Sequence, residues 1–77
     1  MYYVYILKNL INEEVYYGYT NNLERRIEEH NADNKWKCVY FEAYLSEKDA
    51  RNRENKLKYY GQTRTHLKKR ISESLSM

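Results

Sequence analysis

The 77-residue sequence contains no proline, two glycines and one cysteine, and no apolar run approaches the roughly 20 residues that span a membrane. The missing proline and scarce glycine argue against linkers, collagen-like repeats and disorder. The single cysteine, Cys38, excludes an internal disulfide and a cysteine-rich zinc site, and it fits a reducing cytoplasm. No basic, apolar leader opens the chain, so we expect a cytoplasmic protein with no membrane partner. The length predicts a single domain covering residues 1–77.

Ten tyrosines supply most of the 16% aromatic content, so phenol rings should provide most of the large side chains of a thin core. Charge is distributed unevenly along the chain. Residues 46–70 carry nine Lys/Arg and three Asp/Glu, a local charge of +6, whereas the other residues carry five and eight, or −3. Such a basic segment is typical of a surface that binds a polyanion, but a solvated helix face gives the same pattern.

Three segments have the composition of β-strands. Residues 2–8 are β-branched and aromatic, which predicts a strand covered on both faces. Residues 15–19 predict a second strand, and a hairpin loop of the four residues Asn9–Asn12 would place Tyr5 opposite Tyr16 and Tyr3 opposite Gly18. Residues 36–45 predict a third strand with two alternating faces. One face would carry Val39, Phe41, Ala43 and Leu45, and the other Trp36, Cys38, Tyr40 and Tyr44.

Three segments predict helices. The first runs from Leu23 to about Asn31 and should be broken by Asp33-Asn34. The second begins after the N-cap residue Ser46 and continues to about Tyr59, with Gly61 as a C′ stop. The third covers about Thr63 to Ser72. The order β-β-α-β-α-α places the protein in the α/β (α+β) class, with helices packed on a small sheet.

The first predicted helix carries two polar residues on the face that should be buried. At 100° per residue, Arg26 and His30 share the face of Leu23 and Ile27. Taken singly, such a histidine is more often a satisfied core residue than a catalyst, and such an arginine often extends its charged group to solvent.

The second predicted helix shows the same anomaly, because Glu54 lies between Ala50 and Leu57 on its apolar face. An exposed pair with Lys58 is one explanation, whereas a glutamate facing the sheet needs a cation, a metal or water. Inward-facing polar groups beside a tyrosine-rich hairpin form the set that phosphodiester hydrolysis requires. That set is an oxygen ligand for a divalent metal, a proton acceptor and a fixed positive charge.

With these residues identified, the sequence resembles the GIY-YIG nuclease superfamily, and most closely its small single-domain YhbQ-like endonuclease branch. Tyr3-Val4-Tyr5 matches the first signature triad and Tyr16-Tyr17-Gly18 the second, with ten residues between them. The stretches 16–31 and 44–58 are very close to the wording of that branch. Tyr3-Val4 replaces the usual Gly-Ile, and Tyr17 replaces the usual Ile. The resemblance implies a small three-stranded antiparallel sheet flanked by helices.

On the strands, the resemblance implies roles for three residues. Tyr5 corresponds to the tyrosine that is placed at the attacking water and is often proposed as the general base. Tyr16 would hydrogen-bond the scissile phosphate or its water. Gly18 corresponds to the glycine that permits close approach of backbone and substrate.

On the helices, the resemblance implies that Arg26 steadies charge on the phosphate and that His30 assists proton transfer. Glu54 corresponds to the single carboxylate that holds a divalent metal, Mg²⁺ or Mn²⁺. The implied partner is nucleic acid, with DNA favoured over RNA.

The leading hypothesis is a metal-dependent endonuclease with little sequence specificity, acting in DNA repair or processing. The alternative is a nucleic-acid binding module without turnover, in which basic side chains of the C-terminal helices contact the phosphate backbone. A third reading is an interaction domain whose tyrosines only fill the core. The basic side chains are Lys48, Arg51, Lys56, Lys58, Arg64, Lys68, Lys69 and Arg70.

Overall fold

The protein folds into a three-stranded antiparallel sheet with helices on both faces, as seen in the computed structural model, which describes residues 1–32 and 35–77. The predicted helix break at Asp33-Asn34 lies outside the described residues. The strand order is β2-β1-β3, so the most apolar strand is central. The elements are β1 (Tyr2–Asn9), β2 (Val15–Thr20), α1 (Leu23–His30), β3 (Trp36–Tyr44), α2 (Glu47–Tyr59), α3 (Gly61–Arg70) and α4 (Ser72–Ser76).

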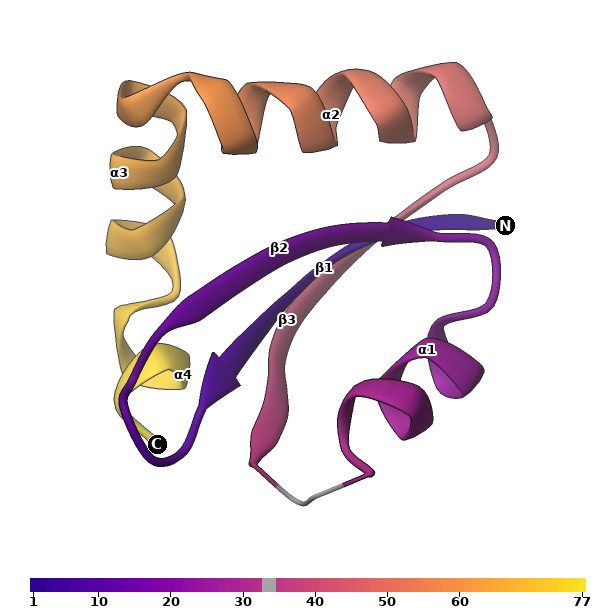
Figure 1. The fold of residues 1–77 in the computed structure, drawn as a ribbon. Coiled ribbons are helices and arrows are strands. Elements are labelled where there is room, and N and C mark those ends of the chain that lie inside the picture. The colour runs from indigo at the N-terminus through magenta and orange to yellow at the C-terminus, as the bar shows by residue number, and fades with distance from the viewer. Residues whose placement is uncertain (33–34) are drawn as a thin grey trace.

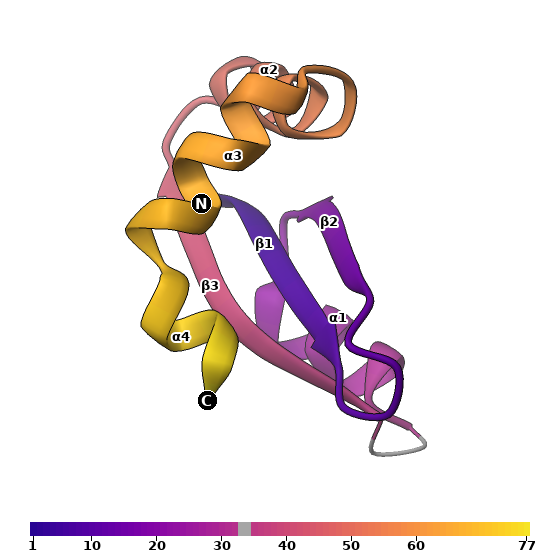
Figure 2. The same cartoon turned by 90° about the vertical axis from the view of Figure 1, so that its left-hand side faces the viewer.

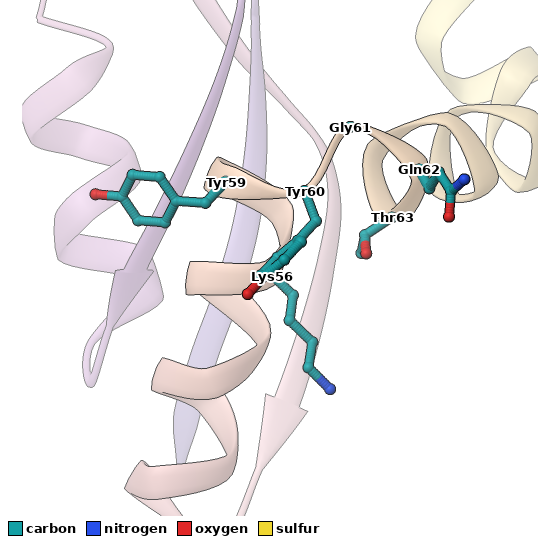
Figure 3. A pocket seen from close by; sticks show the side chains of 6 residues that line it. All are labelled: Lys56, Tyr59, Tyr60, Gly61, Gln62 and Thr63. Carbon is teal, nitrogen blue, oxygen red and sulfur yellow. The ribbon is translucent and has the colours of Figure 1, made fainter.

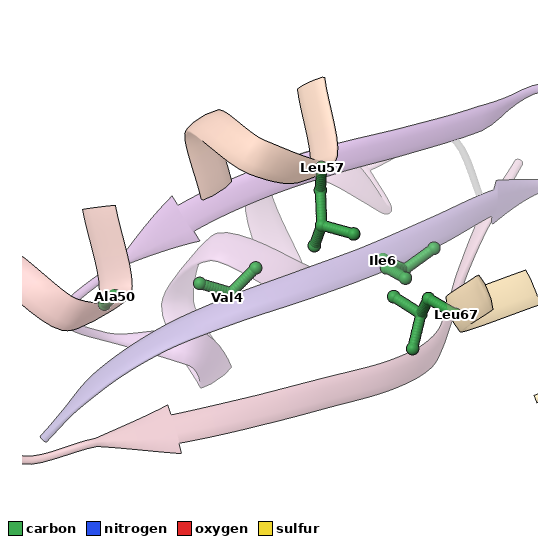
Figure 4. Close-up of a cluster of buried hydrophobic side chains, with 5 residues drawn as sticks. All are labelled: Val4, Ile6, Ala50, Leu57 and Leu67. Carbon is green, nitrogen blue, oxygen red and sulfur yellow. The ribbon is translucent and has the colours of Figure 1, made fainter. Parts of the chain in front are cut away.

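Helix α1 lies on one face of the sheet, and α2, α3 and α4 cover the other (Figures 1 and 2). The main core forms between the sheet and the helices on its second face, where side chains from β1, α2 and α3 meet (Figure 4). Burying each Leu or Ile side chain there contributes roughly 1.5–3 kcal/mol. Central β1 is buried on both faces, as its sequence predicts. The core cluster consists of Val4, Ile6, Ala50, Leu57 and Leu67.

The predicted starts of the first two helices are correct, and each of these two helices has a side-chain cap. The Asn22 side chain accepts a hydrogen bond of 3.1 Å from the Arg25 backbone N–H at the start of α1. The Ser46 hydroxyl accepts one of 3.3 Å from the Asp49 backbone N–H at the start of α2. These bonds satisfy amide groups that have no partner within the helix.

The predicted register of the β1–β2 hairpin is wrong by two residues. Tyr5 lies opposite Gly18 instead of Tyr16, and Tyr16 lies opposite Leu7. Because the error is an even number of residues, it keeps every side chain on its predicted face. It nevertheless changes the neighbours within that face, and it brings a glycine directly beside the Tyr5 ring.

The cause of the register error is the loop that closes the hairpin. The Asn9 backbone N–H donates to the Glu14 carbonyl at 2.8 Å, so the loop covers residues 10–13 instead of the predicted 9–12. The Asn9 side-chain oxygen accepts from the backbone N–H groups of Ile11 and Asn12 at 2.9 and 3.1 Å. Glu13 has a φ of 63°, a left-handed conformation that completes the turn.

The predicted alternation of β3 is wrong at one point. Ile6 pairs with Tyr40 and Leu7 with Cys38, so Val39 is an extra residue in a β-bulge. The bulge shifts the pattern, and Tyr40 and Tyr44 pack against the core while Phe41 and Leu45 are exposed.

Gly61 is not the predicted C′ stop, because it is the first residue of α3 and no described glycine has a positive φ. The extended Tyr60 makes the turn instead, with φ −118° and ψ 108°. The last predicted helix is also divided, since α3 ends at Arg70 and the short α4 begins after Ile71. Within the described residues, no helix has the length and apolar character that crossing a membrane requires.

Candidate active site

The candidate site is centred on the Tyr5 ring, which lies over Gly18. Only 1% of Tyr5 is exposed, and its outer atoms occupy the space that a side chain at position 18 would fill. A Cβ built on Gly18 would be 2.8 Å from Tyr5 Cε2 and closer still to Cζ and the hydroxyl oxygen. Because β2 is an edge strand, the glycine lets the phenol of a central-strand residue extend over the edge of the sheet.

Two further rings pack around Tyr5. The ring centroids of Tyr5 and Tyr16 are 6.2 Å apart, and the His30 ring lies 6.2 Å from Tyr5 and 4.9 Å from Tyr16. Trp36 contacts Tyr16 from the far side at 6.4 Å. The last residue of α1 therefore lies against the two tyrosines that the sequence motifs identified.

Helix α1 has the buried face that its sequence predicts. Its half-buried residues are Leu23, Arg26, Ile27 and His30, and its other four residues are exposed. Arg26 Nε is buried without a hydrogen-bond partner, whereas Nη1 lies 3.8 Å from Glu29 Oε2. A buried, unsatisfied donor on a charged group is costly, and a hydrogen bond to an anion would satisfy it.

Glu54 approaches the same tyrosine from α2, on the other side of the sheet. Its side chain is 17% exposed, and its Oε2 lies 3.2 Å from Lys58 Nζ. Both Arg26 and Glu54 act electrostatically on the Tyr5 phenol. Ring contacts therefore place Tyr16 and His30 beside Tyr5, and the charges of Arg26 and Glu54 act on the Tyr5 phenol.

The pKa of Tyr5 is raised well above the ordinary value of a phenol. Burial is the main cause, followed by the neighbouring Tyr16 phenol, while Glu54 raises it further and Arg26 lowers it. Tyr5 is therefore neutral at pH 7 in the protein alone, where its hydroxyl can both donate and accept hydrogen bonds.

A divalent cation fits the donor set at this edge. Within the described part of the chain, no three His, Cys, Asp or Glu side chains are grouped as a metal site. Glu54 is the one carboxylate among the groups that act on Tyr5, and a single carboxylate would suit Mg²⁺, because Mg²⁺ keeps several waters and binds one or two carboxylates plus substrate phosphates.

The sequence reasoning missed a polar network on β3, the edge strand opposite β2, on the face that α2 covers. Glu42 accepts two hydrogen bonds of 3.0 Å from Arg53 Nε and Nη2, one of 2.7 Å from the Tyr40 hydroxyl, and a short one from the Tyr44 hydroxyl. Burial alone would raise the pKa of Glu42, but these bonds lower it overall. A glutamate between two tyrosines at alternate strand positions was the available signal.

Some of the basic side chains predicted to bind nucleic acid are already bound to other groups of the protein. Arg64 Nη1 donates to the carbonyls of Leu57 and Lys58 at 3.0 and 2.7 Å, and so holds the end of α2. Arg51 lies over the Tyr19 ring at 4.6 Å and pairs with Glu47. The exposed basic residues without such a contact are Lys48, Lys56, Lys68, Lys69 and Arg70.

Comparison with known proteins places this fold in a family. The family model described as the GIY-YIG catalytic domain matches residues 1–58, which include Tyr5, Tyr16, Arg26, His30 and Glu54. The fold and the match define a nuclease-type domain. This chain belongs to the GIY-YIG family, as its sequence motifs predict.

Two curated relatives are similar to this chain. The UPF0213 protein CPE1444 of Clostridium perfringens is 42% identical, and the match covers 75% of this chain and 71% of the relative. The UPF0213 protein HQ_3675A of Haloquadratum walsbyi is 37% identical, with 75% and 74% covered. No solved structure gives a significant match.

Proposed function

We propose that this protein is a divalent-metal-dependent endonuclease that hydrolyses phosphodiester bonds of nucleic acid. The supporting observation is the convergence of Tyr5, Tyr16, His30, Arg26 and Glu54 at the edge strand, where Gly18 provides the space. These groups supply the hydrogen bonds, positive charge and carboxylate that the reaction needs.

Each side chain has a distinct task in this proposal. The Arg26 guanidinium binds a phosphate oxygen and stabilises the charge that develops there. Tyr5 and Tyr16 hold the attacking water between their hydroxyls, and His30 beside them accepts or passes on its proton. Glu54 would hold the cation, which polarises the phosphate and favours loss of a proton from nearby hydroxyl groups.

Hydrolysis then proceeds by attack of the water on the phosphorus atom. The water oxygen forms a bond to phosphorus, one ester P–O bond breaks, and the departing oxygen takes a proton. Cutting should have little sequence specificity, because the groups named here contact phosphate and water, which carry no sequence information. DNA is the favoured substrate, and repair or processing of nucleic acid is the corresponding role.

A nicking assay tests this proposal. Purified protein with Mg²⁺ or Mn²⁺ should nick supercoiled DNA, and chelation with EDTA should stop it. Glu54→Ala should abolish the activity, and Arg26→Gln should lower it on the order of 100-fold. The matched control is Glu28→Ala, an exposed glutamate of α1. Cutting that survives Glu54→Ala would sink the proposal. Branched DNA, single strands and RNA in the same assay would identify the preferred substrate.

A second candidate is a nucleic-acid binding module without turnover, which the Lys58–Glu54 pair favours because it occupies the carboxylate. This candidate predicts salt-sensitive binding that Arg26→Ala leaves unchanged, and no cutting of any substrate with either metal.

A further inference from the structure

Two tyrosines at the junction of α2 and α3 are exposed. Tyr59 is 76% exposed and Tyr60 is 63% exposed, and both line a hollow with Lys56 and the first turn of α3 (Figure 3). The Tyr59 ring projects freely from the end of α2, while Tyr60 extends along the helix in a different direction (Figure 3). Both rings are accessible from solvent.

The fold does not require either ring. Among the described residues, neither Tyr59 nor Tyr60 has a ring contact or a side-chain hydrogen bond, and neither belongs to the core. Leu57 and Leu67 make the core contacts of this region, and Arg64 secures its backbone. Large aromatic surfaces without a structural partner at one place indicate a binding surface.

The charge around these rings identifies the kind of ligand. Residues 55–72 include six Lys/Arg and no Asp or Glu. Lys56 lies within the hollow, and exposed Lys68 lies on the adjoining surface of α3. Exposed aromatic rings within a positive surface are the combination that binds unpaired nucleotides, because bases stack on the rings and phosphates meet the lysines.

The position along α2 links this surface to the candidate active site. Tyr59 follows Glu54 by five residues, which at 1.5 Å per residue is about 7.5 Å along the helix axis. Lys58, which pairs with Glu54, directly precedes Tyr59. At 100° per residue Tyr59 also lies about 140° around the helix from Glu54, so a strand whose phosphate reaches Glu54 would pass around α2 to bring its neighbouring nucleotides to the α2–α3 junction.

We propose that Tyr59, Tyr60 and Lys56 form a binding site for unpaired nucleotides next to the scissile phosphate. This inference rests on the proposed nuclease function and makes it more specific, since it names single-stranded or locally unpaired nucleic acid as the preferred substrate. The tyrosines bind bases by stacking, and Lys56 binds the backbone.

The test measures binding without cleavage. Fluorescence anisotropy with the full chain in EDTA uses two labelled probes of about 12 nucleotides, which is within the range of single-strand binding sites. One probe is oligothymidylate, and the other is an abasic strand with the same phosphates. We expect Tyr59→Ala and Tyr60→Ala each to weaken oligothymidylate binding roughly tenfold and to leave abasic binding unchanged.

Matched variants separate stacking from general damage. Tyr59→Phe and Tyr60→Phe should retain the affinity for oligothymidylate, since they keep the ring. Phe41→Ala, which removes another exposed aromatic residue, should have no effect. Lys56→Ala should weaken both probes equally, whereas Lys37→Ala on β3 should weaken neither.

The outcomes distinguish the two proposals. If Tyr59→Ala and Tyr60→Ala lose equal affinity for both probes, or lose none for either, the nucleotide site is wrong even if nicking activity is present. A wild-type protein that binds neither probe nor duplex DNA would overturn the proposed nuclease function together with this site. Thermal unfolding of each variant confirms that it is folded during the measurement.

Discussion

The Tyr5 phenol illustrates how one residue depends on the smallest side chain next to it. Its ring is almost completely buried and lies against Gly18, so its hydroxyl reaches the sheet edge only because position 18 has no Cβ. The burial that fixes the ring also raises its pKa. Burial therefore determines both the position of the Tyr5 ring and the pKa of its hydroxyl.

Gly18→Ala tests the close approach. Because the Tyr5 ring cannot withdraw within a packed core, we expect a loss of about 1–3 kcal/mol in the free energy of unfolding, together with loss of nicking. Urea unfolding measures the first effect. Gly61→Ala is the matched control, since its Cβ would meet only Arg64 Nη2 at 3.6 Å, and it should be neutral or stabilising. Equal stability of the two variants would contradict the account.

The charges facing Tyr5 make a second prediction. In the metal-free protein, the ¹³Cζ resonance of Tyr5 should keep the shift of a neutral phenol up to pH of about 10, the ordinary tyrosine pKa. Glu54→Gln should lower the pKa of Tyr5 because it removes a negative charge, and Arg26→Gln should raise it. NMR titration measures the onset of ionisation. Shifts of the same sign in both variants would show that the two charges do not face the phenol.

At the scale of elements, the Glu42–Arg53 ion pair joins α2 to β3. Arg53 directly precedes Glu54, so the pair also fixes the part of α2 that carries the candidate metal ligand. The side chains are 14% and 25% exposed, and two tyrosine hydroxyls complete the hydrogen bonding of Glu42. Removing either partner of such a fully hydrogen-bonded pair lowers the stability of the fold.

Removing one partner should therefore destabilise the fold. Arg53→Met should reduce the free energy of unfolding by about 1–3 kcal/mol, because it leaves a partly buried carboxylate without its charged donor. Arg51→Met, two residues earlier on the same helix, should cost less than about 1 kcal/mol, since its pair with Glu47 is exposed. Chemical denaturation compares them, and equal losses would contradict a special role for Arg53.

The same pair makes stability depend on pH. The pKa of Glu42 is lower in the folded protein than its ordinary value of 4.5, so the unfolded chain takes up a proton first as pH falls. Its contribution is present above pH 4.5 and is lost as pH falls through the lowered value. The stability difference between wild type and Glu42→Gln should therefore narrow in acid. Urea midpoints from neutral pH to acid measure it, and a constant difference would contradict the assignment.

The sequence predicted the positions of the strands and helices better than the register between the strands. Apolar periodicity and caps located every strand and the helix starts at Asn22 and Ser46. The hairpin register depended on the Asn9 side chain, which closes the loop through hydrogen bonds that composition does not reveal. The bulge at Val39 likewise changed a simple alternation. The site motifs survived these errors, because an even register shift leaves each residue on its face.

At the scale of the whole molecule, positive charge is concentrated in the helices after β3. Local contacts use part of it, however, because Arg53, Arg64 and Lys58 each bind a carboxylate or carbonyl groups. The number of basic residues therefore overestimates the charge available to a polyanion. The contacts in the folded protein decide how much charge is available, and a count of charges along the sequence does not show these contacts.

Salt dependence of DNA binding tests this distinction. Lys56→Ala and Lys68→Ala should each reduce the slope of log K against log salt concentration by about 0.7–0.9, one phosphate contact each. Arg64→Ala should leave the slope nearly unchanged and lower the melting temperature, because Arg64 holds the α2 carbonyls. Anisotropy titrations at several salt concentrations measure the slopes. A large slope change in Arg64→Ala with unchanged stability would reverse the assignment.

The contact between Tyr5 and Gly18 has a consequence for comparing copies of this domain. If the proposed function holds, we expect a chain that retains every polar group but carries alanine at the second-strand glycine to match the motifs and yet lack nuclease activity. Screening genomes or designed libraries for working members of the family should therefore examine that backbone position before counting acids and bases.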